Sequence, residues 1–320
     1  MTRYILRRVL WGGVLLFVVS ALTFVLFDLL PSGDPARLRA GRGASPQAVA
    51  HIRHELGLDK PIYTQFYDYV KGIVLHFDLG YSYFSHASVE SLIADRLPAT
   101  VSLAAGAILI WLLVGVSVGI VSAVRRRTLL DRSAMGTALL FISAPEYWLG
   151  LLALFLFAAD IGKIPVFPGA GSYVALSADP GKWLSSLVLP WLVLAASFAA
   201  IYARLLRGSL IEVLGEDYIR TARAKGLSER RVVMRHGVRG AITPLITVLG
   251  LDVGTLLGGA LLIEVVFDIP GVGRLNYDAI THADFPIVQG TILLAALFIV
   301  VANILVDISY AYLDPRVRLR

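Results

Sequence analysis

The sequence of 320 residues has no cysteine and little charge, since 16% of its residues are charged and 57% are hydrophobic. A soluble domain of this length would carry about a quarter charged residues. The shortage of charge therefore excludes an ordinary soluble protein and predicts one that is mostly embedded in a membrane. The lack of cysteine excludes disulfide bonds from the segments that lie outside the membrane.

Catalytic signatures are also missing. No Gly-x-x-x-x-Gly-Lys-Ser/Thr phosphate loop is present, because the Gly-Lys pairs at 162–163 and 181–182 lack the upstream glycine and the following hydroxyl residue. An intramembrane protease would need a serine with a histidine inside a span, or a motif that pairs Asp252 with Asp307, and neither is found. His51 and His54 could share a metal ion, but a solvated pair is the expectation. We therefore expect no enzyme, no metal site and no cofactor in this chain.

The sequence does contain six long apolar segments. The first follows three arginines and runs from Val9 to Leu30, which is too long for a signal peptide, whose apolar core has about 7–15 residues. Each segment is long enough to cross a bilayer as a helix, so we predict an all-α membrane protein with six transmembrane helices. Residues 1–30 hold the N-terminus and span 1, and the core at 99–320 holds spans at 99–124, 133–159, 183–203, 241–267 and 287–313.

Residues 31–98 form the one long hydrophilic insert, between spans 1 and 2. Ser45-Pro46 begins an amphipathic helix that ends at Gly57, apolar residues continue at helical spacing to Phe77, and Ser88 can start a third helix towards Leu97. The insert is rich in aromatic side chains. They suit either a layer on the membrane interface or the core of a small subdomain.

The positions of the basic residues predict the orientation. Arginines cluster before span 1, at 125–127 and 132, in the loop 204–240 and in the tail after Asp314, whereas the short loops on the other side contribute only Lys163, Lys182 and Arg274. Because loops rich in Lys and Arg stay in the cytoplasm, both termini and the loop 204–240 are expected there, and the insert outside. The same asymmetry explains the net charge of +6 without any nucleic acid.

The loop 204–240 reads as two short helices that meet at a glycine. Asp217 suits the start of the first helix, Gly226 its left-handed end, and Ser228 the cap of the second. Ile219, Ala222 and Gly226 would give the first helix a narrow face that another backbone could approach. A DNA-reading helix-turn-helix is disfavoured because both ends are tethered to spans, and a merely topogenic basic loop is the simpler alternative.

The run Asp-Tyr-Ile-Arg-Thr-Ala-Arg-Ala-Lys-Gly-Leu-Ser at 217–228, followed by Arg235-His236 and Pro244, resembles the cytoplasmic loop of ABC-importer permeases. It is closest to the dipeptide/oligopeptide/nickel branch. Arg220, Gly240 and Phe77 depart from the usual residues of the general motif or of that branch. Further segments resemble the same branch and extend the resemblance over nearly the whole chain, among them 57–61, 78–82, 96–100, 144–150, 268–274, 284–290 and the C-terminal Leu-Asp-Pro-Arg-Val-Arg.

The resemblance implies a permease subunit of a bacterial inner membrane, in which the first loop helix inserts into a cleft of a separate ATPase. It implies two ATPase subunits that bind ATP and Mg, a second homologous permease and an extracytoplasmic solute-binding protein. Peptides are the implied substrate, with nickel or another small solute as the alternative. The residues that it assigns to the coupling loop are Asp217, Tyr218, Ile219, Arg220, Ala222, Ala224, Gly226, His236 and Pro244.

Polar and small residues inside the spans supply the remaining candidates. Gly250, Gly254 and Gly258 form a ridge for close helix packing, as do Gly115 and Gly119 in span 2. Asp252 lies about 160° around the helix from the ridge at 100° per residue. An intramembrane carboxylate is costly, so Asp252 and then Glu146 are candidates for the translocation path, or for an ATP-independent ion- or proton-coupled carrier that also uses Asp307. A structural aspartate is the alternative, and Glu264 and Asp307 are expected near hydrated span ends.

Overall fold

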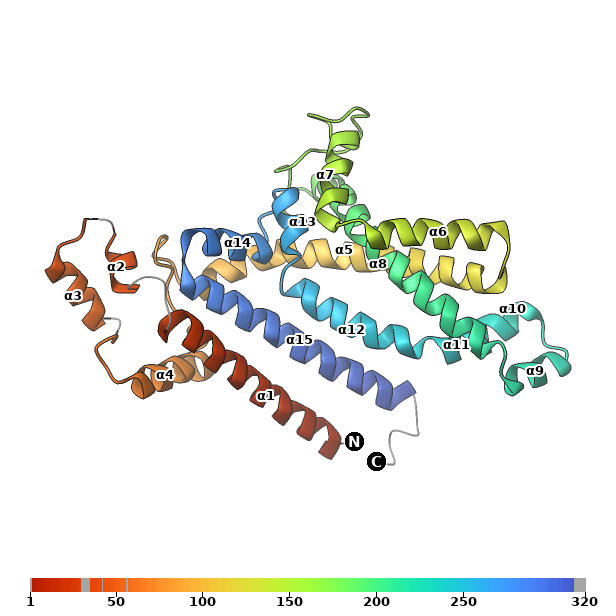
Figure 1. Ribbon diagram of the computed structural model, residues 1–320, viewed down its shortest axis with the longest axis horizontal. Helices are drawn as coiled ribbons and strands as arrows, with labels where there is room; N and C mark the ends of the chain where they lie inside the picture. The colour runs from red at the N-terminus through yellow and green to blue at the C-terminus, as the bar shows by residue number, and fades with distance from the viewer. Residues whose placement is uncertain (1, 30–34, 42, 56, 314–320) are drawn as a thin grey trace.

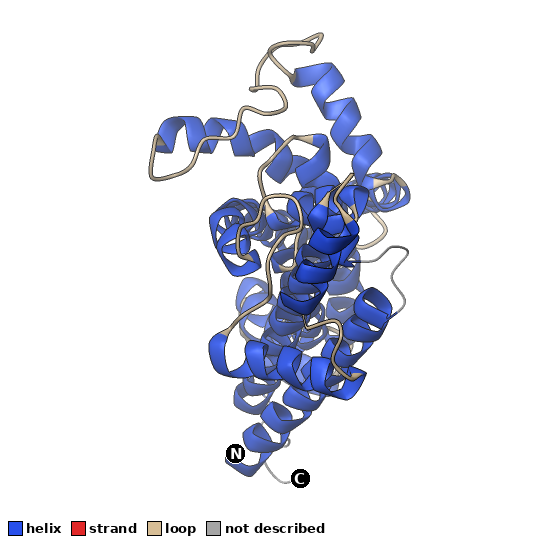
Figure 2. Cartoon of the chain, turned by 90° about the vertical axis from the view of Figure 1, so that its left-hand side faces the viewer, coloured by secondary structure: helices blue, strands red, loops and turns tan. Residues whose placement is uncertain are grey.

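The computed structural model describes residues 2–29, 35–41, 43–55 and 57–313, so the arginines of the C-terminal tail lie outside the described residues. The regular structure of these residues is helical, apart from isolated bridges between Tyr81 and Ser88 and between Ala158 and Phe167. Figure 2 shows the same all-helical architecture from the side. The all-α prediction is therefore confirmed for the described chain.

Four helices are long and apolar enough to cross a membrane. They are α1 (Thr2–Phe24), which continues through a π-helical turn to Leu29, α5 (Val89–Val124), α8 (Pro180–Val213) and α15 (Phe285–Leu313). Two bent pairs raise the number of candidate spans to as many as six. The first pair, α6 (Leu129–Ser143) and α7 (Glu146–Phe157), is bent by 104° at Pro145, which cannot donate a backbone hydrogen bond.

The second bent pair contains the loop and the start of the fifth apolar segment. Helices α10 (Glu229–Arg231) and α11 (Val238–Ala241) flank a π-helical segment at Val232–Gly237, and α12 (Thr243–Leu257) follows after a bend of 54°. The predicted span 241–267 is itself discontinuous. It breaks after Leu257 and resumes as α13 (Leu261–Val266), before α14 (Val272–His282) leads into α15.

Two long helices also extend beyond their predicted spans. Helix α5 begins at Val89, so the separate insert helix predicted from Ser88 is instead the first part of span 2, and Pro98 lies within the helix. Its first turns are buried against α14 and α15 in a cluster of Val89, Ile93, Ala279, Ile287 and Val288, which explains the continuous helix. Helix α8 continues ten residues past the predicted end at Ala203, because Leu206 and Leu210 remain in the main hydrophobic core.

The core is organised around α5 and α8, which cross with little space between them (Figure 1). A Cβ atom on Gly115 would lie 2.9 Å from the Ala199 carbonyl oxygen, and one on Gly119 would lie 2.9 Å from that of Ala203. The absence of side chains thus allows the two backbones to touch. Trp111 is fully buried beside this contact and stacks on Phe198 with ring centroids 4.5 Å apart.

The insert contributes α2 (Pro35–Ala40), α3 (Pro46–Glu55) and α4 (Ile62–Lys71). Phe66 and Tyr69 of α4 pack on Phe24 of α1, with ring centroids 5.3 and 5.7 Å away, whereas Tyr63 and Tyr67 are exposed. Its aromatic residues therefore serve partly as a contact with span 1 and partly as an outer surface. In Figure 1, α2 and α3 lie at one end of the molecule, and α9 (Asp217–Ala224) and α10 lie at the other.

Candidate functional site

Helix α9 projects from the end of α8 and is held by its own chain. Ile219 is fully buried and Ala222 nearly so, in a small cluster with Val232, Leu214 and Leu227. The face predicted for another backbone is thus occupied, at Ile219 and Ala222, by a segment of the same chain. Both side chains pack against the π-helical segment at 232–237. A helix with few apolar residues buries them against the nearest apolar surface, which here belongs to the same chain.

The outward face of α9 is charged. Asp217, Arg220, Ala224 and Gly226 are exposed, and the Arg220 guanidinium lies 3.2 Å from the Asp217 carboxylate. Arg223 donates two hydrogen bonds to Glu229, of 3.0 and 2.7 Å, which tie α9 to the next helix. The exposed surface of α9 is therefore made mainly of polar side chains.

Gly226 ends α9 in the left-handed region with φ of 76°. No atom lies within 4 Å of the position that a Cβ would take there. The glycine is needed for its backbone conformation and not for space inside the chain. Ser228 precedes the next helix in extended conformation, but its side chain makes no capping hydrogen bond, contrary to the expected cap.

Tyr218 and His236 meet in a recess beside α9. The recess has a volume of about 300 Å³ and brings the two side chains together with Arg235, Arg239 and Gly240. A Cβ on Gly240 would lie 2.7 Å from the Tyr218 hydroxyl, so glycine leaves room for the ring. Burial raises the pKa of Tyr218, and the nearby Glu216 carboxylate adds to this rise. Pro244 lies in the first turn of α12, at the edge of this region.

Sequence reasoning did not single out Arg235 and Arg239 as part of this recess. They lie four residues apart, so a helical reading could have placed them on one face. The recess carries positive side chains and a phenol, and is therefore suited to an acidic group of a partner.

Asp252 points away from the glycine ridge, towards α8. The Tyr202 hydroxyl, on a fully buried ring, donates a 2.8 Å hydrogen bond to its carboxylate. The ridge itself faces α15: a Cβ on Gly254 would lie 2.8 Å from the Ile299 Cα, and one on Gly258 would lie 2.6 Å from the Ala295 Cβ. A Cβ on Gly250 would overlap the side chain of Val306.

Glu146 is the first residue of α7, immediately after the bend at Pro145. It is partly buried, and neither a hydrogen bond nor an ion pair joins it to another described residue. No contact brings it to Asp252. The two candidate carboxylates thus stand apart, Asp252 with a phenol partner and Glu146 without one.

The two carboxylates expected near span ends, Glu264 and Asp307, each have a specific partner. Glu264 is completely buried, not hydrated at a span end, and it receives a 2.7 Å hydrogen bond from the Thr100 hydroxyl. Its position follows from the break in the fifth span, which turns α13 inward. Asp307 forms an ion pair of 3.0 Å with Arg8 and so connects α15 to α1.

The sequence reasoning also missed a buried ion pair between α6 and α8. Asp131 is 3% exposed and accepts hydrogen bonds of 2.6 and 2.8 Å from Arg207, in the two-pronged geometry favoured by arginine. The backbone N–H of Arg127 adds a third bond of 2.9 Å. An aspartate beside the arginine cluster was a signal, but its partner lies 76 residues away in the sequence.

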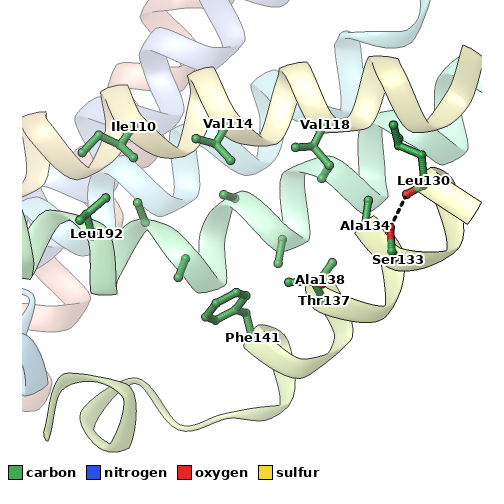
Figure 3. A pocket seen from close by; sticks show the side chains of 15 residues that line it. Ile110, Val114, Val118, Leu130, Ser133, Ala134, Thr137, Ala138, Phe141 and Leu192 are labelled. Atoms are coloured by element: carbon green, nitrogen blue, oxygen red, sulfur yellow. Dashed lines mark hydrogen bonds between the residues drawn. The ribbon is translucent and has the colours of Figure 1, made fainter. Parts of the chain in front are cut away.

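An apolar groove of about 460 Å³ lies between α5, α6 and α8. Figure 3 shows Ile110, Val114 and Val118 of α5 along one side and Ala138 and Phe141 of α6 on another. The floor is a row of alanines on α8. Among the described residues, no group of three or more His, Cys, Asp or Glu side chains is placed to hold a metal ion.

The sequence matches known protein families over most of its length. Residues 115–319 match the family described as "Binding-protein-dependent transport system inner membrane component", and residues 1–104 match the family of its N-terminal region. A protein of Brucella abortus (strain 2308), named as a peptide transport system permease, is 45% identical over 318 residues, 99% of each chain. Proteins of Escherichia coli O6:H1 and Salmonella typhimurium, named as glutathione transport system permeases, are each 41% identical over 318 residues, again 99% of each chain.

These matches cover the chain from end to end and agree with its helical, multi-pass architecture. The chain belongs to the family of inner-membrane permease components of binding-protein-dependent ABC import systems.

Proposed function

We propose that this permease translocates peptides that an extracytoplasmic solute-binding protein delivers. The observation that carries the proposal is its end-to-end similarity to relatives that are named as peptide and glutathione transport permeases. Nickel or another small solute is the second candidate, because the sequence resemblance extends to the branch that carries both.

The proposed complex contains this chain, a second homologous permease and two ATPase subunits that hold ATP and Mg. The chain lacks a phosphate-binding loop, so the energy must come from the partners. Helix α9 and the recess at Tyr218 and His236 form the proposed docking surface, in which Asp217, Arg220 and Ala224 face outward. Both termini of the chain and this surface lie in the cytoplasm, as the charge asymmetry predicts.

The packing of α9 supports a coupling role. Ile219 and Val232 are fully buried together, so α9 and the π-helical segment move as one unit. That segment continues through α11 into α12, and α9 itself follows α8. When ATP binding draws the two ATPases together, a displacement of α9 would therefore reach both α8 and α12 and change access to the cavity between the permeases.

Asp252 is the proposed polar position along the translocation path, with Glu146 as the weaker candidate. The carboxylate of Asp252 retains partial exposure beside Tyr202, and Glu146 lies at a bend without a partner. A carboxylate in a water-filled path could contact the ammonium group of a peptide. An ATP-independent carrier that uses the same carboxylates is the alternative mechanism.

The test is to purify the tagged chain from its native membrane in mild detergent, identify the proteins that accompany it and measure ATP hydrolysis. We expect ATPase subunits and a second permease, and peptide-stimulated uptake after reconstitution with the binding protein. A chain that purifies alone and transports in liposomes without ATP would contradict the proposal. Uptake of nickel in place of peptides would retain the machinery and change the substrate.

A further inference from the structure

A buried carboxylate joins α5, α13 and α14. Glu264 of α13 has no exposed surface. Its Oε1 accepts a 2.7 Å hydrogen bond from the Thr100 hydroxyl of α5, and its Oε2 accepts a 2.9 Å bond from the backbone N–H of Arg274 in α14. Helix α5, which is distant in the sequence, therefore meets α13 and α14 at one side chain.

The same two side chains cap the start of α14. Gly271 precedes this helix and has no side chain to satisfy its first N–H groups. Thr100 accepts a 2.8 Å bond from the Val272 N–H, and Glu264 accepts from Arg274. Thr100 and Glu264 thus replace the missing cap from other elements, and the negative carboxylate faces the positive end of the helix dipole.

The hydrogen-bond arrangement requires a carboxylate at position 264. The Thr100 oxygen accepts the Val272 N–H, and its hydroxyl donates to Glu264. Both oxygens of Glu264 therefore face donors. A glutamine amide would turn an N–H₂ group towards one of them and leave that donor without a partner.

Glycines surround this contact on both sides. A Cβ on Gly271 would overlap the Glu264 carboxylate. Gly259, with φ of 126°, lies where the fifth span breaks, and a Cβ there would lie 2.7 Å from the Gly273 Cα. The break between α12 and α13 is consequently next to the capped start of α14. It lies at Gly259, whose positive φ favours glycine over other residues.

A second buried carboxylate holds the end of the same unit. Asp284, immediately before α15, accepts a 2.5 Å bond from the Ser82 hydroxyl and a 3.1 Å bond from the Tyr83 N–H. The segment from α13 to the start of α15 is therefore fastened to the rest of the outer half at both ends. At the end of α12, at Gly258 and Gly259, no polar side chain among the described residues forms such an anchor, and the helix is held there by the close packing of Gly258 on Ala295 of α15.

We propose that Glu264 is a positioning residue for transport: it holds α13 and α14 on α5, so that movement of α12 ends at a hinge at Gly258–Gly259. This proposal rests on the proposed coupling role of α9, which would deliver the movement to the cytoplasmic end of α12. The outer unit then stays in place while α12 turns against it, and the outer side of the pathway keeps its shape during inner opening.

The cysteine-free chain allows a direct test with pairs of spin labels in the full complex. One pair joins Leu109→Cys on α5 to Ile280→Cys on α14, and the other joins Leu109→Cys to Leu251→Cys on α12; all three side chains are exposed. We expect the 109–280 distance to stay constant between the nucleotide-free and the ATP-vanadate-trapped complex, while the 109–251 distance changes. A 109–280 distance that changes as much as the 109–251 distance would overturn the proposal.

Thr100 supplies a matched pair of variants. Thr100→Ser keeps the hydroxyl, and Thr100→Val keeps the shape but removes the donor and the cap. We expect Thr100→Val and Glu264→Gln to broaden the 109–280 distance distribution and to lower uptake about fivefold or more, as an unsatisfied buried group implies, while Thr100→Ser retains both. Equal behaviour of the Ser and Val variants would contradict the role of the hydroxyl.

The outcomes separate this proposal from the proposed function. If Thr100→Val does not fold, the wild-type and Thr100→Ser distances still decide whether α14 is fixed to α5. If no ATPase accompanies the chain, the proposed function fails. The positioning role is tested separately: a broad distribution of the 109–280 distance in the purified wild-type chain would overturn it.

Discussion

At the scale of single residues, two carboxylates within the apolar segments are satisfied by specific neighbours. Tyr202 gives Asp252 its hydrogen bond, and Thr100 does the same for Glu264. Burying such groups without partners would cost several kcal/mol each, which explains their pairing. Asp252 differs from Glu264 because it keeps partial exposure, which its proposed role in the translocation path requires.

Asp252→Asn tests that difference. Asparagine keeps the size of the side chain and can still accept the Tyr202 hydrogen bond, so we expect normal membrane insertion but about tenfold lower peptide uptake if the charge serves the path. Uptake in proteoliposomes over a range of pH measures the effect. Tyr202→Phe is the control, since it removes the phenol and keeps the carboxylate. Unchanged uptake of the Asn variant at every pH would make Asp252 a structural residue.

At the scale of elements, the helices are positioned by a few close contacts. The ion pair of Asp131 and Arg207 joins α6 to α8 next to the turn that leaves α5. Helix α9 is held through Ile219 on one side and ends at the left-handed Gly226. Each contact determines where a helix end can go, and each can be removed by one substitution.

Arg207→Ala should destabilise the protein by about 2–4 kcal/mol, because it leaves the Asp131 carboxylate buried without its cation. This loss is at the lower end of the range for breaking a buried ion pair, because the side chain of Arg207 is 26% exposed. Thermal unfolding in detergent measures the loss. Arg204→Ala, on an exposed position one turn earlier, is the matched control. An equal melting temperature for both variants would show that the ion pair does not hold α6.

Gly226→Trp should abolish coupled transport and leave membrane insertion intact. The left-handed backbone at φ of 76° is unfavourable for a residue with a Cβ by about 1–2 kcal/mol, and the indole would project from the proposed docking surface. Gly226→Ala separates the two effects, because it keeps the backbone strain without the bulk. Gly43→Trp is the second control, as Gly43 also has positive φ and open space but lies in the insert. Normal transport by Gly226→Trp would contradict docking at this surface.

At the scale of the whole molecule, the two ends have different characters. The helices α9 and α10 lie at one end, while α2 and α3 lie at the other (Figure 1). This arrangement supports the orientation that the basic residues predict, with the first end in the cytoplasm.

Single cysteines in the cysteine-free chain can test the orientation. We expect a membrane-impermeant maleimide to label Lys182→Cys in intact spheroplasts, because that position lies in the first turn of α8, on the predicted outer side. Lys225→Cys and Arg126→Cys should react only after permeabilisation. Labelling of Lys225→Cys in intact spheroplasts would place the loop outside and overturn the predicted topology.

The sequence by itself determined the helical class, the apolar segments and the turn at Gly226. Hydropathy and turn preference are properties of neighbouring residues, so they can be read without knowing the fold. The direction of the glycine ridge followed in the same way, since the helical period separates Gly254 from Asp252 whatever helix lies opposite.

Only the tertiary structure decided which groups meet. Span 5 breaks at Gly258–Gly259, Ile219 turns inward, and Glu264 reaches Thr100 although 164 residues separate them. Arg207 is likewise one of several arginines, and packing alone selects it as the partner of Asp131. The physical reason is that burial and hydrogen bonding depend on the position of distant segments, which local periodicity and charge do not contain.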